Sequence, residues 1–198
     1  EALARAERAI VLGAEPGPQR GLQSDAASWL GETELAAQHA AEAMATLPPG
    51  CVAWCRALAV AALTAGQLGR RGDLLRLSEV LLAIPAIPGA DEARVIAQAR
   101  AAVQYAIIGR LDITQEVLRE VAGTDLPDNA LAGRAWSHRL RANVGMYTAD
   151  LQTFQDGSEE ALRLFRAAAD VRSEAWQRVN VGAGLLLRGD YEMAVRQL

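Results

Sequence analysis

Hydrophobic residues recur along this chain at intervals of three and four positions, the spacing that places them on one side of an α-helix. Near the end, Gly189 and Asp190 interrupt this pattern, and it then resumes at once. A glycine can take the left-handed conformation that ends a helix, and two helices joined by so short a turn must pack on each other. The chain therefore ends in a predicted helical hairpin, whose last helix has on one face Tyr191, Ala194, Val195 and Leu198.

Similar turns precede this one at a regular spacing in the sequence. The turn 149–151, Ala-Asp-Leu, corresponds to the turn 189–191, Gly-Asp-Tyr, and Trp136 corresponds to Trp176, with an offset of 40 in both cases. Sequence repeats of this length are typical of stacked helix pairs. The series continues backwards through Gly109, Gly69 and Gly31, with a last step of 38.

A second spacing, of 37, aligns 141–145 with 178–182. We prefer the spacing of 40, because it aligns both the turn and the tryptophan. Prolines at 48–49, 85–88 and 127 predict loops at the opposite end of each pair, since proline cannot continue a helix. We expect ten helices and the start of an eleventh, near residues 1–13, 19–30, 32–47, 51–68, 72–84, 90–108, 111–122, 128–148, 151–169, 172–187 and from 189.

The last hairpin resembles a tetratricopeptide repeat (TPR), and the matching positions are the step Asn180–Gly182, Leu185, the turn 189–191, Ala194 and Leu198. The resemblance implies an all-α superhelix, a TPR-like solenoid of about ten antiparallel helices, in which residues 1–198 form one domain. A repeat near 40 is longer than the standard one of about 34 residues.

The whole chain also resembles the C-terminal helical-repeat regions of large multidomain bacterial serine/threonine kinases and signalling ATPases of myxobacterial type. The phrases that carry this resemblance are Trp54–Val60 with Leu68-Gly69, Ala149–Leu151 before Phe154, and Asp170–Arg172 before Gln177–Gly182. It implies a regulatory region in a bacterial, cytoplasmic signalling protein. The kinase and ATPase signatures of that family are not in this sequence. The sequence lacks an initiator Met and stops inside an amphipathic pattern, so we expect a segment of a longer protein.

Composition excludes several classes of function. Hydrophobic residues make up 51% of the chain but aromatic residues only 5%, which favours a core of thin, closely packed layers. The net charge is −4 and no basic stripe is visible, so we expect no nucleic-acid partner. All 20 basic residues are arginine, so this segment has no lysine ammonium for a Schiff base or a Walker A phosphate clamp. There is no apolar run of about 18 residues, so we expect no membrane partner.

No constellation for catalysis, cofactor or metal is evident, so we expect no enzyme activity in this segment. His39 and His138 stand about 100 residues apart, with no nucleophile placed beside either by a motif. Cys51 and Cys55 are expected on one face of a helix as small buried residues. A zinc site would need further ligands, and a reversible redox response is left open.

The tryptophans allow two interpretations. One is core packing between adjacent repeats. The other follows from the TPR resemblance, because the first helix of each TPR pair lines the concave surface. The groove positions implied in the last pair are Trp176, Val179, Ala183 and Leu187. Moving back by 40 gives Trp136, Arg139, Asn143 and Tyr147, and a further 80 from Trp136 gives Arg56.

The function that accounts for the whole chain is an interaction scaffold, which binds a peptide or partner domain on that concave surface, including domains of the same polypeptide. The alternative is a small-molecule sensor domain, as in helical-repeat regulators, which requires a pocket between pairs. Arg139, Asn143 and Tyr147 suit either function. We also expect self-association through the apolar end formed by Tyr191, Val195 and Leu198, because terminal repeats normally carry a polar cap.

Overall fold

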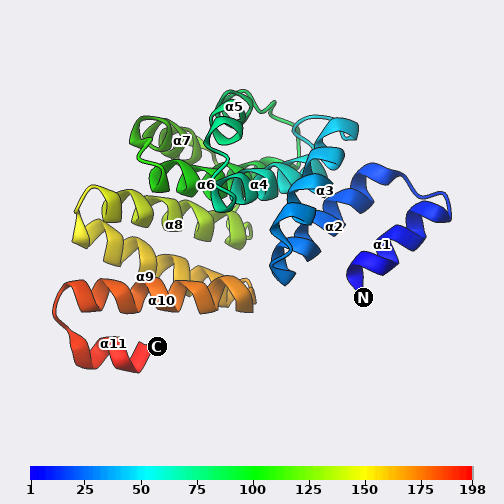
Figure 1. Ribbon diagram of the computed structural model, residues 1–198. Coiled ribbons are helices and arrows are strands. Elements are labelled where there is room, and N and C mark those ends of the chain that lie inside the picture. The colour runs from blue at the N-terminus through cyan, green and yellow to red at the C-terminus, as the bar shows by residue number, and fades with distance from the viewer. Residues whose placement is uncertain (198) are drawn as a thin grey trace. The chain divides into compact units, whose positions relative to one another are not determined.

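The structure is a computed structural model that describes residues 1–197, and over that range it contains eleven α-helices and no strand (Figure 1). The chain divides into two compact units, 1–104 and 105–198. The first contains α1 (Ala2–Val11), α2 (Pro16–Leu30), α3 (Thr33–Thr46), α4 (Val52–Gln67) and α5 (Arg71–Leu82). Helix α6 (Asp91–Ile107) crosses the division, and the second unit contains α7 (Leu111–Gly123), α8 (Leu131–Tyr147), α9 (Leu151–Ala167), α10 (Val171–Leu187) and α11 (Tyr191–Gln197).

The all-α class and the ten expected helices with the start of an eleventh are confirmed, with bounds that differ by three residues at most. Within each unit, helices that follow one another in the chain pack on each other, and α2 also packs on α4. The prediction of one repeat domain over 1–198 stays a prediction.

A residue in the left-handed conformation follows each of the helices α4, α6, α8 and α10, at intervals of 40. Gly69, Gly109, Ala149 and Gly189 have φ angles of +66°, +78°, +60° and +82°. Around each, the next amide reaches back five residues: the amide of Asp150 donates to the carbonyl of Gly145 at 2.8 Å, and the amide of Asp190 to that of Leu185 at 2.9 Å. This bond satisfies a carbonyl that the helix leaves unpaired. The backbone therefore follows the spacing of 40 and not that of 37.

A second kind of turn recurs at the opposite end of the pairs, directly before α4, α6 and α8. The amide of Cys51 donates to the carbonyl of Pro48 at 3.2 Å, and the amide of Ala130 donates to that of Pro127 at 2.9 Å. The amide of Ala90 makes the same contact with Ile87 at 3.0 Å. Because this turn occupies 127–130, α8 begins at Leu131 and not near 128 as expected.

Ala169 marks a second tight turn without a glycine or proline, in addition to the one at Ala149. Ala169 has a φ of +55°, and the amide of Asp170 donates to the carbonyl of Phe165 at 3.0 Å, as in the other left-handed turns. Helix α9 therefore ends at Ala167, before the expected residue 169. Alanine takes this conformation at a cost that neighbouring contacts must offset, so local sequence did not reveal it.

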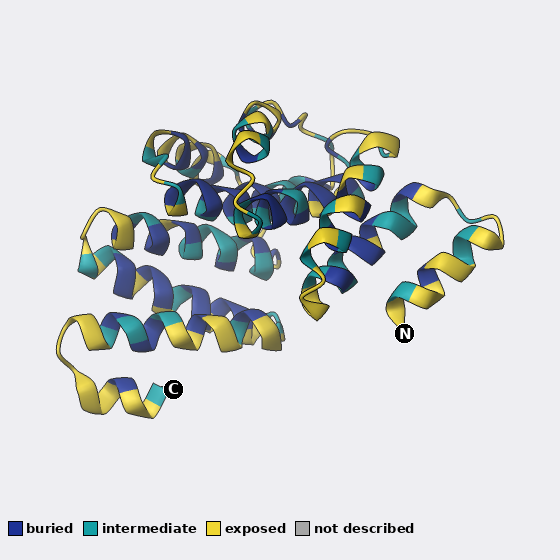
Figure 2. Cartoon of the chain, viewed as in Figure 1, coloured by how far each residue is buried: buried dark blue, intermediate teal, exposed yellow. Residues whose placement is uncertain are grey.

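Small residues let the helices of the second unit approach closely. A Cβ added at Gly145 of α8 would lie 2.8 Å from the amide nitrogen of Phe154, and one at Gly157 of α9 would lie 2.9 Å from the carbonyl oxygen of His138. Both distances are too short for a side chain. On its other side, α9 meets α10, where Gly184 faces the amide oxygen of Gln155. Helices α8, α9 and α10 accordingly lie side by side, with α9 buried along most of its length (Figure 2).

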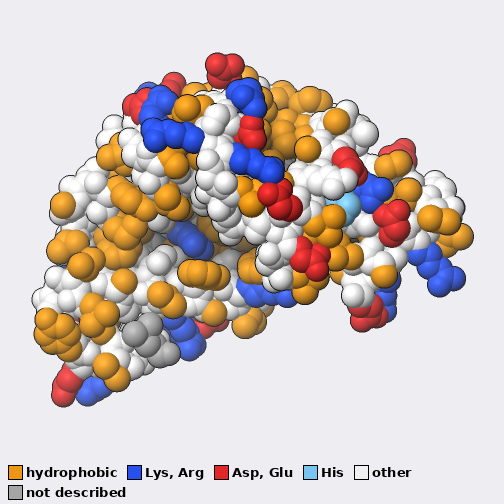
Figure 3. All heavy atoms as spheres, in the orientation of Figure 1, with side chains coloured by type: hydrophobic (Ala, Val, Ile, Leu, Met, Phe, Trp, Pro, Cys, Tyr) orange, Lys and Arg blue, Asp and Glu red, His pale blue; other side chains and the backbone are white. Residues whose placement is uncertain are grey.

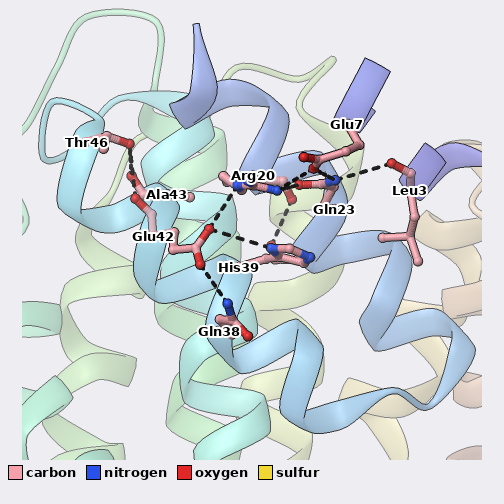
Figure 4. Close-up of polar contacts among 11 residues, drawn as sticks. Leu3, Glu7, Arg20, Gln23, Gln38, His39, Glu42, Ala43 and Thr46 are labelled. Carbon is pink, nitrogen blue, oxygen red and sulfur yellow. Dashed lines mark hydrogen bonds and ion pairs between the residues drawn. The ribbon is translucent and has the colours of Figure 1, made fainter. Parts of the chain in front are cut away.

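The first unit combines a small-residue core with a polar cluster between α1, α2 and α3 (Figure 4). Arg20 donates from Nη1 to Oε2 of Glu7 at 2.7 Å and lies with Nε 2.9 Å from Oε2 of Glu42. Gln23 donates to the same Glu7 oxygen at 3.0 Å and to the carbonyl of Leu3 at 3.2 Å. Hydrogen bonds from Gln23 and Arg20 lower the pKa of Glu7. One arginine thus ties α1 and α3 to α2.

Ala149 and Gly189 occupy equivalent turns and make a matched test of the backbone argument. Ala149→Gly should raise the free energy of unfolding by about 0.5–1 kcal/mol, because the left-handed strain on alanine exceeds the extra entropy of unfolded glycine. Gly189→Ala should lower it by about 1 kcal/mol, since an added Cβ there meets no atom within 4 Å and only the backbone changes. Urea unfolding of both variants measures this. Equal effects of one sign would contradict it.

Candidate functional site

The candidate site lies on one side of α8, where Trp136, Arg139, Asn143 and Tyr147 follow one another at helical spacing. The four side chains are not equally open. Trp136 and Arg139 are half-buried, Asn143 is 9% exposed, and Tyr147 is 39% exposed. The face therefore opens toward the C-terminal end of the helix.

Trp136 is held between two side chains. Its ring meets that of Phe165 of α9 edge to face, with centroids 5.8 Å apart and planes at 82°. The guanidinium carbon of Arg139 lies 4.6 Å from the centroid of the Trp136 ring, within the range of a cation–π contact. Phe165 belongs to a buried cluster with Ala135, Ala161 and Leu164, so the tryptophan closes one edge of the core of this pair. It also packs against the half-buried guanidinium of Arg139.

Asn143 and Tyr147 differ in what they offer a ligand. The side-chain amide of Asn143 donates to the carbonyl of Arg139 at 2.8 Å, a bond within its own helix. Its oxygen is left as the acceptor for any further contact. Partial burial raises the pKa of Tyr147, so its phenol stays protonated and can both donate and accept.

The equivalent face of α10 is apolar and more open. Trp176 is 59% exposed, Val179 48% and Leu187 58%, whereas Ala183 is half-buried. The difference between Trp136 and Trp176 has a physical cause. Helix α9 runs alongside α8 as far as Phe165, but α11 is described only to Gln197 and covers a shorter part of α10. Among the described residues, Trp176 consequently lacks the aromatic neighbour that Trp136 has in α9.

Sequence reasoning missed two exposed residues beside this face. Met146 and Leu186 are 38% and 44% exposed and directly precede Tyr147 and Leu187. The last turns of α8 and α10 both touch the first turn of α9, through the close approaches of Gly145 to Phe154 and Gly184 to Gln155. Hydrophobic side chains gather over the turns that join α8 to α9 and α10 to α11, at the left of Figure 3. An apolar pair directly before each turn is the signal that would have found them.

Arg56 belongs to the first unit, on α4, where its side chain is exposed. Sequence reasoning missed its acidic neighbour, Asp25 of α2. Burial raises the pKa of Asp25, and the positive charges of Arg100 and Arg56 oppose that rise. The first unit thus has a cluster of opposite charges formed by residues of α2, α4 and α6. The second unit has an aromatic cluster instead, at Trp136 and Phe165.

Histidine and cysteine side chains are the usual zinc ligands, and a structural zinc site needs four ligands around the ion. Within residues 1–197, no group of three or more His, Cys, Asp or Glu side chains is arranged to hold a metal ion. Burial lowers the pKa of His138, and His39 is buried with Nδ1 3.8 Å from Oε2 of Glu42.

Comparisons with known proteins identify no relative: no protein-family model matches the chain, and neither does any curated protein or solved structure. None of the helices in the described range is long and apolar enough to cross a membrane. The resemblance to TPR regions of bacterial kinases therefore stays an inference from the residues, whereas an all-helical protein of eleven packed helices over residues 1–197 is shown.

Trp136 and Trp176 provide a matched pair for the role of the α9 contact. Trp136→Ala should lower the free energy of unfolding by about 2–3 kcal/mol, because it removes the edge contact with Phe165 and leaves a hole beside the cluster. Trp176→Ala should change it by no more than about 0.5 kcal/mol, as expected for an exposed side chain. Urea unfolding followed by circular dichroism gives both values. Similar losses for the two variants would contradict the stated cause of their different burial.

Proposed function

We propose that this chain is a non-catalytic scaffold for protein–protein interaction, a TPR-like repeat region of a larger bacterial signalling protein. One observation carries the proposal. At register-equivalent positions of α8 and α10, large apolar or aromatic side chains remain open to solvent, as at Tyr147, Trp176 and Leu187. Exposed apolar residues gathered on one side of a folded domain are typical of a binding surface.

The residue types on this face suit binding of a peptide or a partner domain. Tryptophan, tyrosine and arginine contribute most to interfaces, because each combines a large contact area with a polar group. Trp136, Arg139 and Tyr147 supply these types along a single helix. The stack of Arg139 on Trp136 also holds the guanidinium in place before a partner arrives, which lowers the entropy lost on binding.

The recurrence of the turns supports a stacked array. Left-handed turns at intervals of 40 give successive pairs the same local geometry, and pairs of equal geometry stack into a solenoid with an extended concave surface. In such an array the first helices line that surface, so the mechanism is rigid presentation of their side chains. The proposal includes a cytoplasmic setting, no enzymatic step and no nucleic-acid or membrane partner.

A small-molecule sensor is the second candidate, favoured by the polar half of the α8 face. Arg139 is half-buried beside an aromatic ring, and Asn143 directs a nearly buried amide to the same side of the helix. A metabolite with an acidic and a hydrogen-bonding group would be held by these two. A sensor would depend on Arg139 and Asn143 alone, whereas a peptide scaffold would also depend on Tyr147 and Trp176.

The two candidates separate in one binding experiment. Partners captured from a bacterial lysate on the immobilised chain are identified by mass spectrometry, and the affinity of each is then measured with purified components. The double variant Tyr147→Ala with Trp176→Ala should lower the affinity for a protein partner tenfold or more, which corresponds to about 1.4 kcal/mol or above. The same double variant separates the sensor, because a metabolite held by Arg139 and Asn143 would keep its affinity.

The control is Val80→Ala, which changes an exposed apolar residue on α5, a second helix. It should leave the affinity for the same partner unchanged. Equal binding by the wild type and the double variant would contradict the proposal for this face.

Self-association through the last helix is proposed as well. Only Ala194 of α11 is buried, while Tyr191 and Val195 are 67% and 76% exposed. Their counterpart in α9 shows how such a face packs: Gln155, which is equivalent to Val195 at the spacing of 40, is buried against α10. A second copy of the chain can cover the equivalent face of α11. Leu198, the remaining residue of the predicted apolar end, lies outside the described residues.

Val195→Glu tests this self-association by sedimentation velocity. The wild type should show a concentration-dependent rise in sedimentation coefficient, and the variant should sediment as a monomer at the same concentrations, because a buried unpaired carboxylate strongly opposes contact. Glu192→Gln, on the same helix, is the control for a change of charge alone. Unchanged association of the Val195 variant would sink the idea.

A further inference from the structure

The two cysteines lie together at the start of α4. Cys51 is the N-cap of the helix, with φ −67° and ψ 159°, and its Sγ accepts a hydrogen bond from the amide of Trp54 at 3.5 Å. This position usually has a Ser, Thr, Asp or Asn, whose oxygen is a far better acceptor than sulfur. The cap is therefore weak, and the sulfur can leave it at low cost.

Cys55 turns back toward the same end of the helix. Its Sγ donates to the carbonyl of Gly50 at 3.5 Å, and the side chain is fully buried. The amide of Cys55 donates to the carbonyl of Cys51 at 2.9 Å, so one hydrogen-bonded turn separates the two residues.

Residues one turn apart have Cβ atoms about 5–6 Å apart, and a disulfide needs about 3.5–4.5 Å. Closing that gap requires a small backbone change. Cys51 can supply it, because its ψ of 159° already lies outside the helical range.

The two thiols differ in access. Cys51 is partly exposed, whereas Cys55 is not. Burial raises the pKa of Cys55 to about 11, the neighbouring Cys51 adds to this rise, and Arg94 opposes it. An oxidant dissolved in water thus meets Cys51 first, while Cys55 stays a protonated thiol that is shielded from direct attack.

We propose that Cys51 and Cys55 are a redox-modification site, in which peroxide converts the two thiols reversibly into a disulfide at the start of α4. The sulfur of Cys51 attacks the peroxide O–O bond and becomes a sulfenic acid, with release of one water. The sulfur of Cys55 then attacks that sulfur, the S–S bond forms and a second water leaves. Two thiols are oxidised and one hydrogen peroxide is reduced.

The disulfide would alter the end of the helix. The sulfur of Cys51 would lose its hydrogen bond from the amide of Trp54, a residue that is buried at the start of α4. The turn before it is tightly packed, since a Cβ at Gly50 would lie 2.7 Å from the carbonyl oxygen of Pro85. Movement at Cys51 is thereby transmitted to the loop between α5 and α6. This site does not depend on the proposed binding function.

The test uses the purified chain, hydrogen peroxide and intact-mass spectrometry after alkylation under denaturing conditions. Wild type should lose both thiols together, with a mass decrease of two hydrogens, remain monomeric on a non-reducing gel, and recover both thiols with dithiothreitol. In Cys55→Ser, Cys51 should accumulate as a sulfenic acid that dimedone labels. Cys51→Ser, which replaces the capping sulfur with an oxygen, should retain an unmodified Cys55.

Cys55→Ala provides the same readout as Cys55→Ser if the buried hydroxyl disturbs folding, and circular dichroism checks each variant. A wild type in which Cys51 is oxidised while Cys55 remains free would overturn the proposal. A disulfide found only between chains would overturn it as well.

Discussion

The left-handed turn that ends the first helix of successive pairs is the constraint on which this structure depends. It brings the backbone back on itself within two or three residues, so that the second helix must pack against the first. Because the turns recur at intervals of 40, the second helix of each of these pairs starts from the same local backbone geometry. The consequence is visible at Gly145 and Gly157, since the helices approach closely enough to exclude side chains at both positions. Larger residues there would separate α8 from α9.

The helical layers enclose both small and aromatic side chains. One cluster of the first unit consists of Ala27, Ala36, Ala40 and Val60, whereas Phe165 is fully buried in a cluster of the second unit. Trp136 lies at the edge of that second cluster, against Phe165 on one side and Arg139 on the other. A ring in this place stabilises the pair and at the same time holds the Arg139 guanidinium beside it. The two interpretations of the tryptophans, core packing and an open face, are therefore compatible at this residue.

Polar residues inside the helical layers have a structural purpose of their own. Arg20 joins Glu7 and Glu42 from two neighbouring helices, so that α1 is held by charge although only Ala6 of that helix is buried. Gln177 donates from its buried amide to the carbonyl of Ser158 across the contact of α9 with α10. These bonds select one pairing of helices among the many that alanine and leucine surfaces allow, because a wrong pairing would leave the polar groups without partners.

The sequence by itself determined the helices, their order and the spacing of 40, because apolar periodicity, the glycine before Asp190 and the prolines act within a few residues of where they stand. It also located the face of α8, since helical spacing alone places Trp136, Arg139, Asn143 and Tyr147 on one side. Only the tertiary structure decided that Trp136 is half-buried and Trp176 open, that Ala169 takes a left-handed turn, and that both cysteine sulfurs turn toward the start of α4. Each of these depends on contacts with residues beyond the local pattern, such as Phe165 beside Trp136, and periodicity along one helix has no information about the helix that will cover it.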